Sequence, residues 1–405
     1  MLSIPLLVLI IITRLTSACR IVNETCDCFV NENADLQVDC TWTNTVETLL
    51  DFSELIIEGQ NISFRVNIKN KMLKSLKSST YPLNSATLER VIVLDVANNK
   101  IKTLEASTFI DFKSLLELYL SQNEIEFLWP GTFERLASLK TLDLSWNKLK
   151  LVQNETFCGL INLENLFIDQ NLLNSFEANS FDQLKQLKEA KAIGNKLEQL
   201  EIYGSAIEIF HLQNNDLVRV VFGKMFSLKV LLLYFNKLEK ITSRMFRSLG
   251  NLTTLWLNNN NIYYIEENAF QDLISMEELL LYSNKLSIIQ QATFKNLPKL
   301  KSLSLRQNNI SIIENYSFES LTSLQSLLLA ENKLKTLSSL TFARLSSLEV
   351  LFLQNNELVD FEENVFKETF ALKKLILYNN RLESIKKFYF LNLTSLAVLW
   401  LHENR

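Results

Sequence analysis

The sequence predicts an α/β-type repeat solenoid, with a parallel sheet on its concave face and irregular segments on its convex side. Three observations support this fold class. From residue 91 onward the chain copies itself, an asparagine recurs at a nearly constant step, as at Asn99, Asn123 and Asn147, and a phenylalanine follows most of these asparagines by ten positions. Each coil of a solenoid buries its apolar residues only against its neighbours, so a chain of 405 residues does not have to divide into several closed domains.

The repeated segments define the strands. Residues 139–149, 252–262, 300–310 and 348–358 read LKTLDLSWNKL, LTTLWLNNNNI, LKSLSLRQNNI and LEVLFLQNNEL. All four fit the pattern L-x-x-L-x-L-x-x-N-x-L. Because the x-L-x-L part has a period of two, it predicts a short strand whose leucines point inward and whose other side chains point outward.

The asparagine of each repeat lies where the chain leaves the strand. Its amide has two donors and an acceptor, so it can satisfy backbone groups of its own and of adjacent coils, and a ladder of asparagines is expected. The regular step is broken only where the asparagines fall closer together, at Asn195, Asn215 and Asn236. We expect a local change of curvature in these two short repeats.

A second row of side chains should stack on the convex side. Ten positions after most of the asparagines stands a phenylalanine, and these rings are expected to pack on one another. The exceptions are Ser205 and Met225, which belong to the two short repeats. The phenylalanines are Phe109, Phe133, Phe157, Phe181, Phe246, Phe270, Phe294, Phe318, Phe342, Phe366 and Phe390.

With these motifs, residues 91–405 resemble extracellular leucine-rich-repeat proteins of the typical 24-residue subtype. The resemblance implies a horseshoe whose strands line the concave face. Residues 51–90 fit the repeat poorly and are expected to form degenerate first repeats, whereas the last repeat, at Asn404-Arg405, is incomplete. A C-terminal cysteine cap, common in these proteins, is absent from the sequence. We expect either that the chain is a fragment of a longer protein or that a partner covers its open end.

Four of the five cysteines lie in residues 19–50, in a segment Cys19-x6-Cys26-x-Cys28-x11-Cys40. Four cysteines allow three disulfide connectivities, and the C-x-C spacing disfavours a zinc site. The segment resembles the N-terminal cysteine cap of the same family, in which the first cysteine pairs with the third and the second with the fourth. This resemblance implies Cys19–Cys28 and Cys26–Cys40.

The fifth cysteine, Cys158, is left over. It is either a free, partly buried thiol or the site of an intermolecular bridge that would make a homodimer.

Residues 1–18 predict a signal peptide. An apolar run from Ile4 to Ile12 is too short to span a bilayer as a helix and is followed by the small residues Ser17 and Ala18, so cleavage is expected after Ala18. No later apolar stretch reaches the length of a membrane span. We therefore expect an extracellular protein, either secreted or the ectodomain of a cell-surface protein.

Seven Asn-x-Ser/Thr sequons agree with this compartment, and none has Pro in the middle position. Together with a signal peptide they predict a glycoprotein. The acceptors are Asn23, Asn61, Asn154, Asn251, Asn309, Asn315 and Asn392.

Large apolar residues occupy strand positions that are expected to face solvent. These positions lie four and two places before each repeat asparagine, and exposed apolar surface of this kind usually marks an interaction site. No sequon falls in either column. One group comprises Leu232, Tyr234, Phe235, Trp256, Leu280 and Tyr282. The other comprises Leu328, Phe352, Ile376, Tyr378 and Trp400.

Several function classes are disfavoured. A formal net charge of -4 gives no support for a nucleic-acid partner, which calls for a basic surface. The chain has two histidines, His211 and His402, and none of the common catalytic, phosphate-binding or metal-binding motifs, so we expect neither an enzyme nor a metal or cofactor. Asp95, Asp143 and Asp169 form an acidic strip, either solvated or suited to a basic ligand.

The sequence therefore favours recognition. Its leading interpretation is a secreted or cell-surface protein that binds a protein ligand through its concave face, as a receptor-type molecule would. The alternative is a structural extracellular-matrix or adhesion component that self-associates, through Cys158 or through the open C-terminal end.

Overall fold

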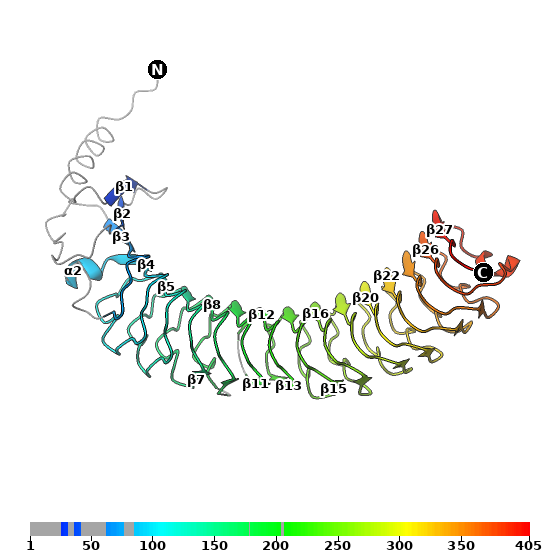
Figure 1. Ribbon diagram of the computed structural model, residues 1–405, viewed down its shortest axis with the longest axis horizontal. Coiled ribbons are helices and arrows are strands. Elements are labelled where there is room, and N and C mark those ends of the chain that lie inside the picture. Colours follow the sequence, from blue (N-terminus) through cyan, green and yellow to red (C-terminus); the bar gives the residue numbers. More distant parts are fainter. Residues whose placement is uncertain (1–25, 31–35, 42–61, 77–84, 178, 204–205) are drawn as a thin grey trace, which may run out of the picture. The chain divides into compact units, whose positions relative to one another are not determined.

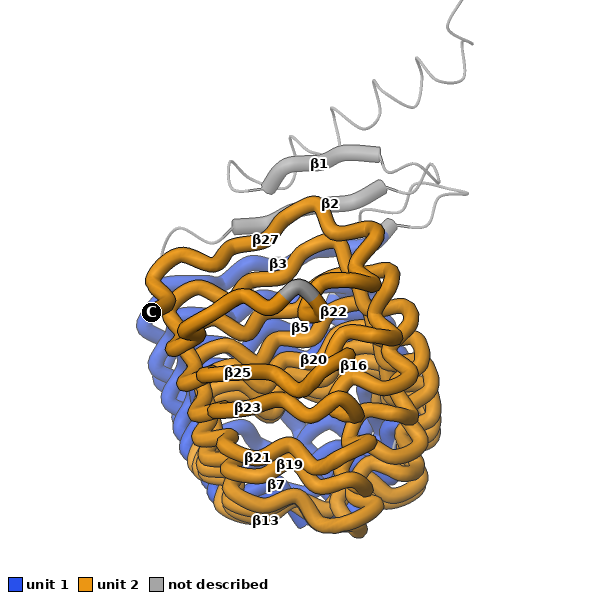
Figure 2. The backbone as a smooth tube through the Cα atoms, turned by 90° about the vertical axis from the view of Figure 1, so that its right-hand side faces the viewer, with its two compact units in different colours: residues 1–190 blue, residues 191–405 orange. Residues whose placement is uncertain are grey.

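The computed structural model describes residues 26–30, 36–41, 62–76, 85–177, 179–203 and 206–405 (Figure 1). The expected signal peptide, Cys19, Asn23, Asn61 and Ser205 lie outside these residues. The chain forms two compact units, residues 1–190 and 191–405, which are described one at a time (Figure 2).

Unit 1 is a solenoid built on parallel strands. A hairpin of β1 and β2 opens it, and from β2 onward each strand of its front sheet pairs in parallel with the next. Its front strands are β1 (Cys26–Val30), β2 (Leu36–Thr41), β3 (Ile62–Asn67), β4 (Val91–Asp95), β5 (Glu117–Tyr119), β6 (Thr141–Asp143) and β8 (Asn165–Phe167), with the short helix α2 (Ser85–Leu88) before β4. On its other side lie the outer strands β7 (Leu151–Val152) and β9 (Ser175–Phe176), while β10 (Glu189–Lys191) straddles the boundary between the units.

The hairpin of β1 and β2 contains three of the four cysteines of the expected N-terminal cap. Cys26 and Cys40 are directly opposed in the antiparallel register of β1 and β2. This register agrees with the implied Cys26–Cys40 pair, while both disulfides remain predictions.

Unit 2 repeats the same coil (Figure 1). Its front sheet is parallel throughout and consists of β12 (Ile209–His211), β14 (Val230–Leu232), β16 (Thr254–Trp256), β18 (Glu278–Leu280), β20 (Ser302–Ser304), β22 (Ser326–Leu328), β24 (Val350–Phe352), β26 (Lys374–Ile376) and β27 (Val398–Trp400). Its outer strands pair two by two: β11 (Gln199–Tyr203) with β13 (Arg219–Gly223), β15 (Lys240–Ile241) with β17 (Tyr264–Ile265), β19 (Ile288–Ile289) with β21 (Ile312–Ile313), and β23 (Thr336–Leu337) with β25 (Asp360–Phe361). The 3-10 helix η2 (Lys387–Phe390) occupies the outer side of the last complete coil.

The parallel-sheet solenoid predicted from the sequence is confirmed. Within each unit the front strands lie on the inner side of the curve and the outer strands on the other (Figure 1). The outer side consists mainly of turns and short strands, and α2 and η2 are the helical elements among the described residues. No helix in the described parts of the chain is both long and apolar enough to cross a bilayer.

The predicted asparagine ladder is present. Asn284 is representative: its Nδ2 donates to the carbonyls of Leu257, Leu281 and Tyr282 at 2.9–3.3 Å, and its Oδ1 accepts from the backbone N–H of Ile262 at 3.0 Å. Each ladder asparagine from Asn99 to Asn380 is buried, at 4–8% exposure. The amide thus closes its own turn and also bonds the coil that precedes it.

The predicted stack of phenylalanine rings is also present. In unit 2, Phe270 lies between Phe246 and Phe294, with ring centroids 6.1 and 6.2 Å apart and interplanar angles of 13° and 2°. In unit 1, Phe109 and Phe133 stack at 6.0 Å. In the coils of regular length the rings fill the outer half, where the chain makes turns.

In the two short repeats, β-strands take the place of the stacked phenylalanine rings. There β11 and β13 are each five residues long and alternate buried and more exposed side chains, with Ile202, Val220 and Phe222 in the core. Met225 is fully buried in place of the missing ring. Because a short coil has less chain available for turns, its outer side closes with longer strands.

Candidate functional site: the exposed face of the front sheet

The front strands of unit 2 bring several predicted residues together. The parallel register aligns Leu232 of β14 with Trp256 of β16, and Trp256 with Leu280 of β18. The Tyr234 ring lies 5.9 Å from the Trp256 ring and 5.7 Å from the Phe235 ring. We call Tyr234, Phe235 and Trp256 the front aromatic cluster.

Leu232 differs from the expectation. It is 8% exposed, although the sequence placed it on the surface. Its register partners are His211 on one side and Trp256 on the other. Both flanking side chains are ring-bearing, so the smaller leucine between them is covered. The same holds for Ile376, 2% exposed between Phe352 and Trp400.

Phe235 is the most exposed member of the front aromatic cluster, at 52%. It directly precedes the ladder residue Asn236, and the backbone at this point of the coil is left-handed, with φ 52° at Phe235. A bulky residue rarely adopts this conformation, because its Cβ approaches the backbone. In unit 1, Trp146 stands at the equivalent position with φ 55° and 58% exposure, a residue that the sequence reasoning missed.

Trp256 is held by a polar contact. Its Nε1 donates to the Oε2 of Glu278 at 2.8 Å, from one front strand to the next. The indole therefore has one edge hydrogen-bonded and the Tyr234 ring beside it, tilted by 48°. Leu280 and Tyr282 are half-buried on the neighbouring coil and extend the surface. An apolar surface with a fixed orientation loses little side-chain freedom when a partner binds.

The second predicted group gathers at β24, β26 and β27. Tyr378 packs on Trp400 at 6.4 Å and stacks on His402 at 4.7 Å with an angle of 6°. The sequence reasoning missed Lys374, whose Nζ lies 5.0 Å from the centre of the Phe352 ring and 5.6 Å from that of Trp400. A cation between two ring faces is attracted by both. Trp400 is 48% exposed.

The acidic strip of unit 1 has local structural roles. Asp95 pairs with Lys69 at 2.6 Å, and Asp143 accepts hydrogen bonds from the N–H and hydroxyl of Ser145. Nearby, burial and then a 2.8 Å hydrogen bond to Glu117 raise the pKa of Tyr119 to about 12. Asp95 and Asp143 are thus engaged in contacts within the chain.

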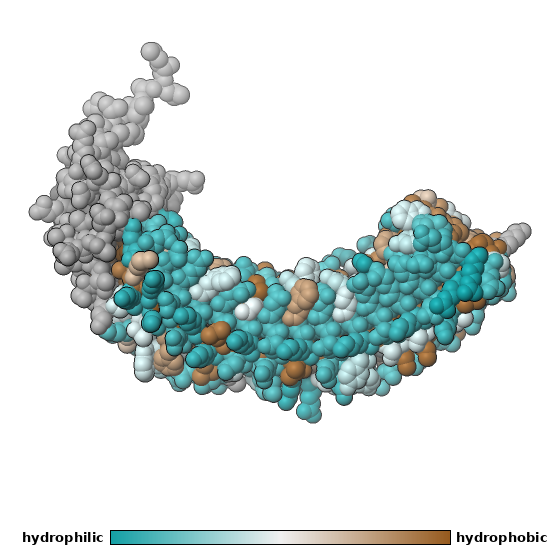
Figure 3. Space-filling model, viewed as in Figure 1, coloured by the Kyte–Doolittle hydropathy of each residue, from teal (hydrophilic) through white to brown (hydrophobic). Residues whose placement is uncertain are grey.

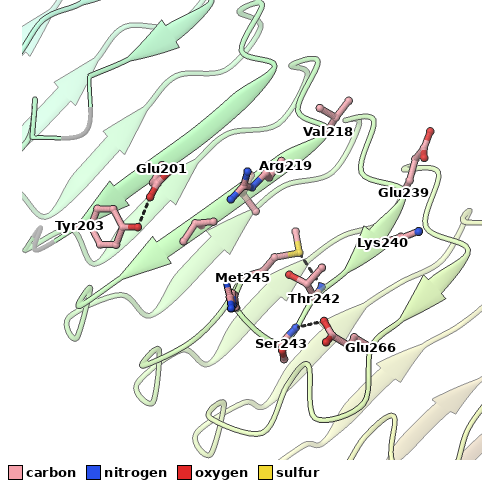
Figure 4. A pocket seen from close by; sticks show the side chains of 13 residues that line it. Glu201, Tyr203, Val218, Arg219, Glu239, Lys240, Thr242, Ser243, Met245 and Glu266 are labelled. Atoms are coloured by element: carbon pink, nitrogen blue, oxygen red, sulfur yellow. Dashed lines mark hydrogen bonds between the residues drawn. The ribbon is translucent and has the colours of Figure 1, made fainter.

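A groove of about 810 Å³ lies on the outer side of unit 2, over the short repeats (Figure 4). Tyr203 of β11 forms one wall, where its hydroxyl bonds Glu201 and its ring lies where a Cβ on Gly223 would stand. On the far wall the N–H of Ser243 donates to Glu266 at 2.9 Å (Figure 4). The sequence signal for this groove was the altered spacing, but spacing alone does not show which side chains line it.

The remaining predicted sites are dispersed. Cys158 is a free, half-buried thiol. Asn251, Asn309, Asn315 and Asn392 are exposed, and Asn154 is half-buried. Within the described residues, no cluster of three or more His, Cys, Asp or Glu side chains could hold a metal ion.

Comparisons with known proteins agree with the fold. Residues 89–149 match the leucine rich repeat family model, and residues 218–312, 239–373 and 287–404 match the BspA type leucine rich repeat region. No curated protein sequence matches the chain.

Solved structures give the same result. A leucine-rich-repeat protein of Leptospira interrogans, LIC12759, is 26% identical with a TM-score of 0.57, over 84% of this chain and 90% of that one. The Toll–Spatzle complex of Drosophila gives 17% identity and a TM-score of 0.68, over 96% of this chain and 66% of that one. The LRIM1/APL1C complex gives 18% and 0.67, over 93% and 68%. At these identities the last two show the fold alone.

Proposed function

We propose that this chain, which carries leucine-rich-repeat domains, is a secreted or cell-surface protein that binds a protein ligand through the exposed face of its front sheet. The observation that carries the proposal is the front aromatic cluster, in which three large rings from two adjacent coils of unit 2 lie together. Aromatic residues of this kind dominate the binding energy of protein interfaces.

The open geometry supports a protein ligand. Side chains on a parallel sheet are spaced by about 4.8 Å from strand to strand, so a ligand contacting several coils must be extended over many residues. A small molecule requires a concave pocket that surrounds most of its surface. Two of the similar solved structures are themselves complexes of proteins, Toll with Spatzle and LRIM1 with APL1C.

The chemistry of the front sheet favours binding over catalysis. Among the described residues, the side chains clustered on it are mainly aromatic and aliphatic, and Glu278 and Lys374 contact these rings rather than each other. We therefore assign the chain a binding role without an enzymatic step.

The test uses the secreted chain and two variants. Extracellular proteins of the source organism are passed over immobilised wild type, Trp256→Asp and Tyr264→Asp. Tyr264 is the matched control, because it is an exposed aromatic residue on the outer side of the same unit. We expect a protein that is retained by wild type and Tyr264→Asp and lost from Trp256→Asp. Equal retention by all three folded chains would refute the assignment of the front aromatic cluster.

A further inference from the structure

The outer side of unit 2 carries an apolar patch of its own. Ile288 of β19 and Ile312 of β21 are register partners in a parallel pair, and they are 46% and 51% exposed. Tyr316, in the turn that follows β21, is 36% exposed. We call Ile288, Ile312 and Tyr316 the outer apolar patch. Neither it nor the outer groove belongs to the front sheet that carries the proposed function.

Exposure of this apolar patch to water is energetically unfavourable. A single exposed isoleucine is ordinary, but Ile288 and Ile312 lie side by side on paired strands and so form one apolar surface. The lateral surface of unit 2 seen in Figure 3 is mainly hydrophilic, with apolar residues scattered over it. Toward the C-terminus the patch ends at the next outer strand, which begins with Thr336. One coil before Ile288 the equivalent position holds Tyr264, which is 43% exposed.

Tyr316 adopts a backbone conformation that is unusual for an aromatic residue. Its backbone is left-handed, with φ 62°. At the equivalent point of two other coils, eight positions after the ladder asparagine, the residues are Asn268 and Asn364, which tolerate this conformation better than an aromatic residue does. The left-handed backbone at Tyr316 therefore costs conformational free energy.

Two glycosylation sequons flank the patch. They are Asn309-Ile310-Ser311 and Asn315-Tyr316-Ser317, so each acceptor lies three positions from Ile312, about 10 Å along an extended chain. Both asparagines are exposed, and Tyr316 is the middle residue of the second sequon. No other coil of the sequence contains two sequons.

We propose that N-linked oligosaccharides on Asn309 and Asn315 lie over the outer apolar patch and shield it from water and from other proteins. The inference rests on the extracellular role proposed above, because the sequons are used only in the secretory pathway. A pyranose ring has an apolar C–H face and hydroxyl groups at its edge. Its face packs on Ile288, Ile312 and the Tyr316 ring, while its hydroxyls stay hydrated.

The placement separates two surfaces of the same unit. The front sheet has no sequon in its exposed columns and remains open for a protein ligand. The outer side has its apolar residues next to two acceptors. The glycans thus suppress association on the side that does not bind the ligand.

The experiment compares the full chain, secreted from a eukaryotic host, with an Asn309→Gln/Asn315→Gln variant. The matched control is Asn251→Gln/Asn392→Gln, which removes two exposed acceptors elsewhere in unit 2. Peptide mass spectrometry gives the occupancy of each site. Fluorescence of an apolar dye reports exposed hydrophobic surface, and light scattering reports self-association.

We expect both sites to be occupied, and the Asn309→Gln/Asn315→Gln variant to bind several-fold more dye and to self-associate where the wild type and the control stay monomeric. Adding Ile288→Ser and Ile312→Ser to that variant should return dye binding to the wild-type level. An unchanged dye signal, or an equal rise in the control, overturns the inference. Secretion of the wild type with bare Asn309 and Asn315 also overturns it, while ligand loss in Trp256→Asp would still support the proposed function.

Discussion

The indole of Trp256 and the carboxylate of Glu278 are joined by a 2.8 Å hydrogen bond that runs between adjacent strands of the front sheet. The bond occupies the only polar atom of the indole. The ring therefore presents apolar surface in a fixed direction, with Tyr234 beside it. Ligand binding should depend on this acceptor as well as on the ring.

For that reason Glu278→Ala is expected to weaken ligand binding. Loss of one hydrogen bond that orients the ring should raise the Kd about fivefold, or ~1 kcal/mol. Glu278→Gln keeps an acceptor oxygen and should change the Kd by less than about twofold. Surface plasmon resonance with the captured ligand measures both. If Glu278→Gln weakens binding as much as Glu278→Ala, the charge matters rather than the orientation of the ring.

The asparagine ladder predicts a large loss of stability for Asn284→Ala. The substitution leaves the N–H of Ile262 and three carbonyls without the amide that bonds them. We expect the free energy of unfolding to fall by about 3 kcal/mol or more. Urea denaturation followed by circular dichroism measures it. Asn261→Ala removes a half-buried amide outside the ladder, so it is the control and should change stability little.

The ring stack predicts a cost for Phe270→Ala. This ring is 1% exposed and packs on Phe246 and Phe294, so its removal leaves a cavity between two coils. The expected loss is about 3–5 kcal/mol. Phe270→Leu fills part of the space and should lose less. Equal denaturation midpoints for wild type and Phe270→Ala would show that the outer side tolerates the gap.

The free energy of unfolding should decrease at acidic pH, and part of this decrease should come from protonation of Asp360. The Lys386 ammonium, followed by the hydroxyl of Tyr389, lowers the pKa of Asp360 to about 2. Since the folded pKa is below the ordinary value of about 3.9, the carboxylate stabilises the fold above that pH, and this contribution is lost as pH falls from about 4 through 2. The difference in urea midpoint between wild type and Asp360→Asn should shrink across this window. A constant difference would contradict the assignment.

Alanine substitutions at two glycines of unit 1 should distinguish the cost of backbone strain from the cost of steric overlap. Gly159 and Gly131 both have positive φ, 90° and 83°. A Cβ on Gly159 would stand 2.3 Å from the backbone oxygen of Glu134, whereas one on Gly131 would be 3.7 Å from the nearest atom, the end of a flexible side chain. Gly131→Ala should therefore cost about 1–2 kcal/mol from conformation alone. Gly159→Ala should cost clearly more in the same denaturation assay; equal losses would mean that the backbone of Glu134 moves aside.

Much of the fold follows from the period of the sequence. The inward leucines, the ladder asparagines and the rings such as Phe270 recur at the same step along the chain, so their contacts with neighbouring coils follow from spacing alone. Part of the front aromatic cluster could be anticipated, because Tyr234 and Trp256 occupy the repeat positions expected to face solvent.

What could not be predicted depends on neighbours across strands. Leu232 is buried because the side chains beside it are larger, and an alternating pattern treats every outward position alike. Lys374 joins two rings that lie on the strands on either side of it, and the left-handed backbone at Trp146 follows from the turn before the ladder. The outer isoleucines fall outside the leucine pattern and carry no repeat signal.

The ladder also gives the solenoid a direction. Asn308 reaches back to the carbonyl of Leu281 and the N–H of Leu286 in the coil before it, and Asn332 does the same one coil later. A coil's turn is therefore completed by the coil that follows it in the chain. During synthesis from the N-terminus, the backbone groups of a newly made turn form their hydrogen bonds to the ladder asparagine only after the next coil has been synthesised. Assembly on the ribosome should accordingly advance one coil behind the growing chain.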